Sequence, residues 1–442
     1  MMPAAPRRCV LRLMVILAFL PMISRSPALA AEEAPTLPAP TPDVPPARRL
    51  TLEEAKQLAL ADNKSLALAH LSIEEKRHIK AAAWKDYFPK ILGNVTYLRF
   101  NDNLGSVVTV PNLGLGLVAP GTTISTNAVR QNSTFTTALV AQPITKLIAV
   151  NAAVQIARAD EIAARAQLDK GTRDLLSGVA QAYYALLGAQ RIETALSLQV
   201  QMLEGLVKAT PLPALRIGLL EAQQGLVQVR GQARELTDQL DNLLNLPPCT
   251  RLELVDPIPV EPPVRCADDA AQVALANSPE VRAAQQDVAK ARAALQVARM
   301  DYIPDVLLFG GYQNQSAIPI IQPNISFLGV TANYTFWEWG KRKNITNQRK
   351  TQIALAEQNV QVTMDKVALE ARKSYNSFEQ AREAYQLAGA MVQARKEAEK
   401  TAIGKAAVQA KAETAKAELD QMKAEIAYRV AYAQLAALIC VE

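Results

Sequence analysis

Residues that usually carry enzyme or metal chemistry are scarce in this chain of 442 residues. It has four cysteines and two histidines, His70 and His78. So few cysteines cannot form a disulfide scaffold, and two histidines eight positions apart, roughly 12 Å along a helix, cannot share a metal ion. No Walker loop, nucleophile elbow, HExxH motif or paired CxxC motif occurs in the sequence. We therefore predict that the protein is not an enzyme and has no cofactor or metal site.

Aromatic residues and net charge are also low. Only 5% of the residues are aromatic although 50% are hydrophobic, so alanine supplies much of the apolar content, which favours helix. The formal charge is +6, and four of the positive residues lie in a segment that we expect to be removed: Arg7, Arg8, Arg12 and Arg25. Without them the charge is +2, which gives no reason to expect nucleic-acid binding.

Long apolar runs are missing except near the N-terminus. Arginines precede the run Leu13 to Leu20, and Ala28-Leu29-Ala30 has the small residues of a cleavage site, so we predict a signal peptide over residues 1–30. A membrane anchor is the alternative, but Pro21 interrupts the run before the ~20 residues that span a bilayer. Residues 31–49 hold six prolines and are expected to form an extended tether. The mature chain is then either soluble outside the cytoplasm or enters a membrane as strands.

The chain contains an internal duplication. Residues 51–97 match residues 266–312 without a gap at an offset of 215, with 13 identities in 47 positions. Further along the offset becomes 192, which pairs Tyr183 with Tyr375 and Glu221 with Glu413. We therefore predict a first repeat over residues 50–246, a proline-rich linker over 247–265 and a second repeat over 266–442. The extra 23 residues of the first repeat fall between Tyr97 and about Phe135.

Each repeat has the same predicted order of elements. Residues 51 to about 88 favour a helix that Pro89 ends. Alternating segments rich in Thr, Val, Tyr and Phe predict two strands in each repeat: Ile91 to Asn103, Asn132 to Gln142, Val306 to Gln315 and Ile325 to Trp337. Helical patterns then run from about Pro143 to Thr210 and from about Glu338 to Thr401, and both return as second helices, Ala214 to Leu246 and Lys405 to Ile439.

These elements cannot form a closed structure within one chain. Small residues repeat at heptad positions of the second long helix, which predicts coiled-coil packing. A 64-residue helix would be roughly 95 Å long, several times the size of a compact domain. Two short hairpins leave open strand edges that need partners. Three copies would supply 12 strands, enough for a closed transmembrane barrel that the helices continue as a tube.

At this point the sequence resembles the TolC-like outer-membrane efflux proteins. The resemblance lies in the duplicated order of three motifs: Leu52-Glu53-Glu54-Ala55 through Asn63 with its echo Ala270 to Pro279, the junctions Asp86-Tyr87-Phe88-Pro89 and Asp301-Tyr302-Ile303-Pro304, and Phe336-Trp337-Glu338-Trp339-Gly340-Lys341-Arg342. It implies a mainly α fold with a small β part, in which a duplicated helix-strand-strand-helix unit forms, as a homotrimer, a 12-stranded outer-membrane β-barrel continued by a long α-helical periplasmic barrel.

The same resemblance implies a function. The protein would be the passive exit duct of a tripartite efflux or type I secretion system, in contact with outer-membrane lipid and coupled to an inner-membrane pump through a periplasmic adaptor. Most of the chain would lie in the periplasm. A soluble periplasmic coiled-coil adaptor or scaffold is the alternative, and the four alternating segments argue against it.

Several residues are candidates for parts of such a channel. Glu413 and Glu221 are predicted at the periplasmic entrance, where carboxylates would favour cations; ordinary solvated carboxylates are the alternative. Adaptor docking would involve the hairpin tips, where the sequence departs from the usual family pattern: Pro211, Leu212 and Pro213 in the first repeat, and Ile403, Gly404 and Lys405 in the second.

Other candidates have structural roles. Pro89, Pro143 and Pro304 are expected at helix-strand junctions, because proline fixes φ and lacks a donor. Tyr334, Phe336, Trp337 and Trp339 are expected at the membrane boundary, with packing between subunits as the alternative. Cys249 and Cys266 bracket the linker and could form a disulfide or remain free thiols. The insertion from Leu98 to Thr134 is expected to form a long outward loop; its Gly114 and Gly116 do not indicate a nucleotide site.

Overall fold

The computed structural model describes residues 48–102, 104–109, 123–209, 213–247, 250, 252–256, 264–319, 321–401 and 405–439. The predicted signal peptide and residues 31–47 of the tether lie outside this part of the chain. Arg48 and Arg49, which we assigned to the tether, begin the short strand β1 (Arg48–Leu50).

The first repeat opens with two helices rather than one. Helix α1 (Leu52–Asp62) starts in a capping box, because the amide of Glu54 donates to Thr51 Oγ1 at 3.2 Å and the amide of Thr51 donates to Glu54 Oε2 at 2.9 Å. The single helix predicted over residues 51–88 is wrong. The Asn63 side chain accepts from the amides of Ser65 and Leu66 and so starts a new helix, α2 (Lys64–Lys85).

The second repeat copies this arrangement at the offset of 215. Helix α5 (Ala267–Asn277) is capped by Cys266, which occupies the position of Thr51, and its Sγ accepts from the amide of Asp269 at 3.4 Å. Ser278 takes the place of Asn63 and caps α6 (Pro279–Met300), with Pro279 in the first turn. The duplication thus extends to the helix caps, although the capping residue differs in type at both corresponding positions.

Four strands form one antiparallel sheet in the order β2-β5-β7-β8: β2 (Lys90–Arg99), β5 (Asn132–Pro143), β7 (Asp305–Gln315) and β8 (Asn324–Asn333). The pairing of β5 with β7 joins the two repeats. The fourth strand was predicted to reach Trp337, but its pairing with β7 ends at Asn333, because Asn333 lies opposite Asp305, the first residue of β7.

We had expected the insertion in the first repeat to be a long outward loop, but part of it forms strands. It holds a further antiparallel pair, β3 (Leu104–Thr109) and β4 (Thr123–Val129), which forms a separate two-stranded sheet. Both segments are rich in the β-branched residues Thr and Val, which fit a pleated strand, even though their alternation is weak. Gly114 and Gly116 lie outside the described residues.

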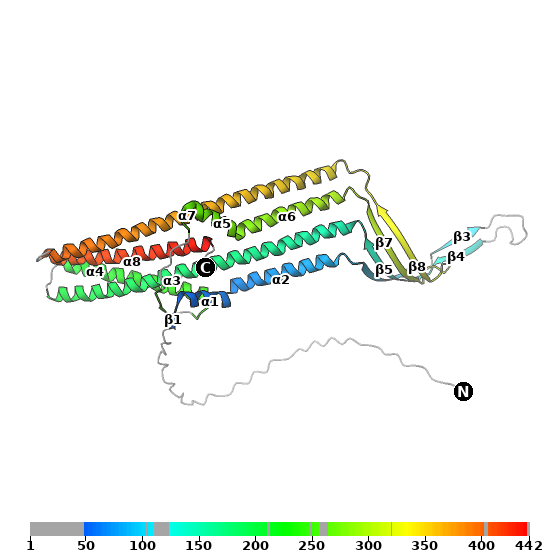
Figure 1. Ribbon diagram of the computed structural model, residues 1–442. Coiled ribbons are helices and arrows are strands. Elements are labelled where there is room, and N and C mark those ends of the chain that lie inside the picture. The colour runs from blue at the N-terminus through cyan, green and yellow to red at the C-terminus, as the bar shows by residue number, and fades with distance from the viewer. Residues whose placement is uncertain are drawn as a thin grey trace, which may run out of the picture. The chain divides into compact units, whose positions relative to one another are not determined.

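Four long helices follow the strands: α3 (Lys146–Ala209), α4 (Pro213–Leu244), α7 (Lys341–Thr401) and α8 (Lys405–Ile439). Helices α2, α3, α6 and α7 lie side by side in the same order as the strands that they adjoin (Figure 1). Helix α4 packs back along α3, and α8 packs between α7 and α3. Helices α2 and α7 are therefore the outer members of this row, as β2 and β8 are the edges of the sheet.

Small residues allow the helices to approach closely. Buried alanines line α3, among them Ala152, Ala159 and Ala166, and Val367 and Ala371 are buried on α7. Gly188 of α3 lies directly against Ile426 of α8, because a Cβ at this position would be only 2.0 Å from Ile426 Cδ1. The approach of the two repeats at this level thus depends on glycine.

The linker is fastened to the helices by a small core that the sequence did not reveal. Strand β6 (Leu252–Leu254) pairs in parallel with β1. The fully buried Tyr183 lies below this pair, and its hydroxyl is 2.8 Å from the carbonyl oxygen of Leu50 and 2.5 Å from that of Val255. Its counterpart Tyr375 donates to the carbonyl of Arg265 at 3.0 Å. Each repeat therefore uses a tyrosine to fix a segment that precedes a short helix.

Candidate functional site

The four-stranded sheet has two faces of different character. Residues that lie opposite each other on neighbouring strands face the same side of the sheet. Ile91 lies opposite Val140, Val140 opposite Gly310 and Gly310 opposite Leu328, so these four residues share one side. We call this side the apolar face. Its large exposed side chains are Ile91, Val95, Tyr97, Val140, Leu308, Tyr312, Leu328 and Val330. Leu328 is 81% exposed and Ile91 is 80% exposed.

Such exposure is costly for a protein surrounded by water. Over the four strands, the single charged residue of the apolar face is Arg99, at the end of β2. Strand β5 has 12 residues, which at ~3.3 Å per residue and a tilt of about 40° cover roughly 30 Å, the thickness of a hydrocarbon core. An apolar surface of this kind and height marks contact with another molecule or with lipid.

The opposite side of the sheet, the inner face, is mixed. Through the same register it carries Lys90, Asn94, Gln313 and Thr331 beside the ring pair Phe309 and Phe327, whose centroids are 6.2 Å apart. Both edge strands pair on one side only within the described residues, since β2 contacts β5 and β8 contacts β7. The sheet is therefore an open segment with apolar and polar faces and two free edges.

The three prolines lie at the ends of strands. Pro89 directly precedes β2, Pro304 directly precedes β7, and Pro143 is the last residue of β5. At each of these positions the chain changes from a helix to a strand or from a strand to a helix. Proline has no backbone N–H, and at such a junction its absence interrupts neither the hydrogen bonds of the helix nor those of the sheet.

Aromatic side chains are exposed at both ends of the sheet. After β8, Phe336 and Trp339 are each 88% exposed and Trp337 is 71% exposed. The indoles of Trp337 and Trp339 pack edge to face at 5.8 Å, and Trp339 takes a positive φ of 53° that turns the chain into α7. Tyr334 is partly covered, because the guanidinium of Arg342 lies 4.8 Å from its ring centre.

Two tyrosines stand toward the other end of the strands. The hydroxyl of Tyr97 donates to Asn132 at 3.1 Å, and that of Tyr312 donates to Asn324 at 2.8 Å. Rings whose apolar part faces outward and whose hydroxyl finds a polar partner suit the boundary between lipid and water. The sheet is thus bordered by aromatic residues at both ends.

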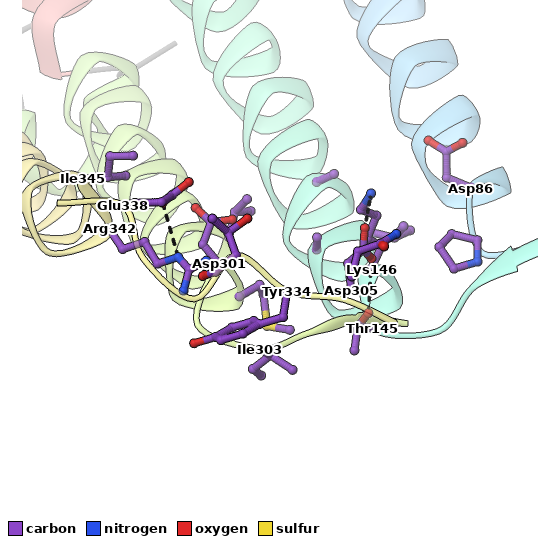
Figure 2. A pocket seen from close by; sticks show the side chains of 18 of the residues that line it. Asp86, Thr145, Lys146, Asp301, Ile303, Asp305, Tyr334, Glu338, Arg342 and Ile345 are labelled. Atoms are coloured by element: carbon purple, nitrogen blue, oxygen red, sulfur yellow. Dashed lines mark hydrogen bonds and ion pairs between the residues drawn. The ribbon is translucent and has the colours of Figure 1, made fainter. Parts of the chain in front are cut away.

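The junction between sheet and helices also holds ion pairs that the sequence analysis missed. Lys146 at the start of α3 binds Asp305 at the start of β7 at 2.7 Å, and Thr145 Oγ1 donates to the same carboxylate at 3.3 Å (Figure 2). Arg342 binds Glu338 at 3.4 Å. The sequence does contain a signal, because charged residues cluster beside the junction prolines. It could not reveal the pair Lys146–Asp305, because these two residues belong to different repeats.

The two predicted hairpin tips are only partly described. Pro211, Leu212, Ile403 and Gly404 lie outside the described residues, whereas Pro213 begins α4 and Lys405 begins α8. Near the second tip, Glu413 of α8 is paired with Arg395 of α7. Glu221, at the matching position of α4, is exposed and has no ion pair in the described part of the chain.

The cysteines and histidines do not form a site in the described part of the chain. Cys266 is exposed and caps α5, while Cys249 lies outside the described residues, so their disulfide stays a prediction. His78 lies 3.7 Å from Glu74, and the described residues contain no group of side chains that could hold a metal ion. None of the helices in the described ranges has both the length and the apolar character needed to cross a membrane.

Comparison with known proteins identifies this architecture. Residues 270–440 match the family described as outer membrane efflux protein. No curated protein matches the chain. Among solved structures, the outer-membrane channel OprN is 16% identical, with 88% of this chain and 89% of that chain covered and a TM-score of 0.71. The open-state MtrE outer membrane channel of Neisseria gonorrhoeae is 17% identical, with 88% of each chain covered and a TM-score of 0.70.

A third similar structure is the outer membrane protein VceC of Vibrio cholerae, at 12% identity, 88% and 95% coverage and a TM-score of 0.68. At such low identity these structures show the fold, which extends over both repeats. The resemblance to TolC-like proteins and the mainly α fold with a small β part are confirmed. The matched family consists of outer-membrane efflux proteins and not of enzymes, as we expected from the sequence.

Proposed function

We propose that this chain, whose residues 270–440 match the outer membrane efflux protein family, is one of three subunits of a channel that serves as a passive exit duct across the outer membrane and the periplasm. The observation that carries the proposal is the apolar face of an open sheet, mounted on helices of up to 64 residues. Three sheets of four strands would close into a barrel of 12 strands, with the apolar face toward lipid and the inner face toward the lumen.

Closure would satisfy both free edges at once. In a three-fold assembly β2 of one copy would pair with β8 of the next, so that each edge amide and carbonyl finds a partner. The helices support the same arrangement. The outer helix α7 has exposed Leu355, Val362 and Leu369 at intervals of seven, and the outer helix α2 has exposed Leu68, Leu71 and Ile79. These two stripes would be covered between neighbouring subunits.

The proposed partners follow from the resemblance to TolC-like outer-membrane efflux proteins. We propose that the α3–α4 and α7–α8 hairpin ends meet a periplasmic adaptor, and that the adaptor connects the channel to an inner-membrane pump of an efflux or type I secretion system. For delivery to the outer membrane, residues 1–30 would be removed as a signal peptide, leaving the tether and the two repeats.

The assembly can be tested by extraction and mass. We expect the protein to require detergent and to give a particle with three times the mass of the mature chain in light scattering corrected for detergent. A stable monomer, or complete extraction without detergent, would instead favour the soluble periplasmic scaffold.

A pair of variants tests the assignment of the two faces. Leu328→Arg places a charge on the apolar face, and we expect it to reduce the membrane-inserted trimer strongly, because an arginine facing lipid costs roughly 2–4 kcal/mol at mid-membrane. Gln313→Arg, on the inner face, is the matched control and should still yield the trimer. Equal yields for both variants would contradict the proposed orientation.

A further inference from the structure

An open cavity of about 750 Å³ lies where the sheet meets the helices (Figure 2). Its floor is apolar and comes from three helices, with Val150 and Ala153 of α3, Val297 and Met300 of α6, and Ile345 of α7. This volume is within the range of sites that enclose small organic molecules, and such sites combine an apolar floor with a few polar groups.

The register places this cavity on the inner face. Among the lining residues, Asp305 lies opposite Asn333, and Pro143 lies opposite Leu307. Alternate residues of a strand face the same side, so Asp305 shares its face with Phe309, and Asn333 shares its face with Gly329. Both belong to the inner face, whereas Leu308 and Val330 belong to the apolar face. In the proposed channel the cavity therefore opens to the lumen, at the level where the barrel continues into the helices.

Most charges around the cavity neutralise one another. Asp86 and Lys90 pair at 3.2 Å, and the pairs Lys146–Asp305 and Arg342–Glu338 have been described above. Arg342 is held further, because it donates to the carbonyl of Thr335 at 2.5 Å and lies over the Tyr334 ring. Fixed pairs of this kind leave little net charge at the rim.

The duplication explains why one carboxylate is left over. Asp86 of the first repeat corresponds to Asp301 of the second, and Lys90 corresponds to Asp305. In the first repeat Lys90 neutralises Asp86. In the second repeat Asp305 replaces this lysine and forms its own ion pair with Lys146 of α3. Asp301, at the end of α6, lines the cavity and has no ion pair in the described part of the chain.

We propose that this cavity is a transit site for organic cations that carry an apolar body. The body would lie on the alanine, valine and methionine floor, and the positive group would face Asp301. Lys341 and Asp301 both line the cavity, are exposed and have no ion pair in the described part of the chain. Lys341 carries its charge on a long flexible stem at the start of α7, whereas the short Asp301 side chain keeps its carboxylate at the cavity. The proposal rests on the proposed channel function.

The test uses two small water-soluble ions with similar rings and opposite charge, benzyltrimethylammonium and benzenesulfonate. Block of single-channel current through the trimer is measured in planar bilayers. In the wild type the cation should block at lower concentration than the anion. Asp301→Asn should raise the half-blocking concentration of the cation roughly fivefold, as for the loss of one partly solvated charge interaction. The anion should change by less than twofold.

Two further variants separate charge from shape. Ala153→Leu fills the floor at an exposed position and should weaken block by the cation while Asp301 remains. Asp62→Asn removes an exposed acid at the end of α1, away from the cavity. The cation should block this variant at the same concentration as the wild type. The mass of each trimer is measured first, so that a folding defect is recognised.

The outcomes distinguish the inference from the function on which it rests. Stronger block by the anion in the wild type, an unchanged cation block in Asp301→Asn, or no effect of Ala153→Leu would overturn the transit site, while the channel proposal would stand. A trimer that forms no conducting pore would overturn both.

Discussion

The guanidinium of Arg395 on α7 pairs with the carboxylate of Glu413 on α8, near the end of the hairpin that these helices form. Both side chains are a little under half exposed, at 45% and 42%. The next residue, Thr414, is buried and donates to the carbonyl of Ala410 at 3.0 Å. The candidate entrance acid is therefore a partly neutralised charge, and its effect on passing ions depends on its arginine.

The first prediction concerns this pair in the assembled channel. Glu413→Gln should ease block by multivalent cations, because it removes a carboxylate that the proposed trimer would place near its three-fold axis. Arg395→Ala should strengthen the block, because it leaves the same carboxylate without its partner. Single-channel conductance with and without multivalent cations measures both. An unchanged block in both variants would mean that the pair faces solvent outside the tunnel. Glu221→Gln shows whether the first repeat contributes.

Packing between the repeats is tested at a glycine. In Gly188→Ala the new methyl group would meet Ile426, so we expect destabilisation by roughly 1–3 kcal/mol. Gly178→Ala is the matched control on the same helix. It has open space around the added Cβ, and should be stabilised by up to about 1 kcal/mol through helix propensity. Apparent melting temperatures that move in the same direction would contradict the close approach of α3 and α8.

Tyr183 should make stability sensitive to alkaline pH. Burial raises the pKa of its hydroxyl to about 12, against an ordinary value of 10. Because the folded pKa is above the unfolded one, the stabilisation by the protonated hydroxyl is present below pH 10 and is lost as the pH rises toward 12. Tyr183→Phe should melt lower at pH 8, by roughly 1 kcal/mol for one lost hydrogen bond, and should lose less between pH 10 and 12. An equal alkaline loss would show that other groups control it. Tyr302→Phe, at an exposed tyrosine, is the control.

Asp256 should have the opposite pH dependence. Partial burial would raise the pKa of its carboxyl, but hydrogen bonds from Arg429 and Arg191 outweigh this and lower it. A lowered pKa stabilises the fold above the unfolded value of about 4, and this is lost as the pH falls below it. Asp256→Asn should therefore melt lower at pH 7 and lose less stability in acid. A wild-type acid profile in this variant would mean that the two arginines do not hold the linker.

Local signals were sufficient for much of the fold. The alternating segments predicted β2, β5, β7 and β8, and the uninterrupted helical patterns predicted long helices whose bounds match α3, α7 and α8 closely. Asn63 was overlooked although its type is readable as a cap, because the helical pattern continues on both sides of it. Strands β1 and β6 could not be predicted, since three-residue segments about 200 positions apart have no periodicity.

The candidate sites divide in the same way. The sequence by itself determined the duplication, the order of helices and strands and the exposed aromatic motif after β8, because propensity, hydrophobic period and proline act over a few neighbouring residues. The tertiary structure alone decided that the apolar residues of four strands share one face, that Lys146 neutralises Asp305 while Asp301 is left over, and that Arg395 holds Glu413. These facts depend on register and on contacts between segments far apart in the chain, which are set by packing between the two repeats.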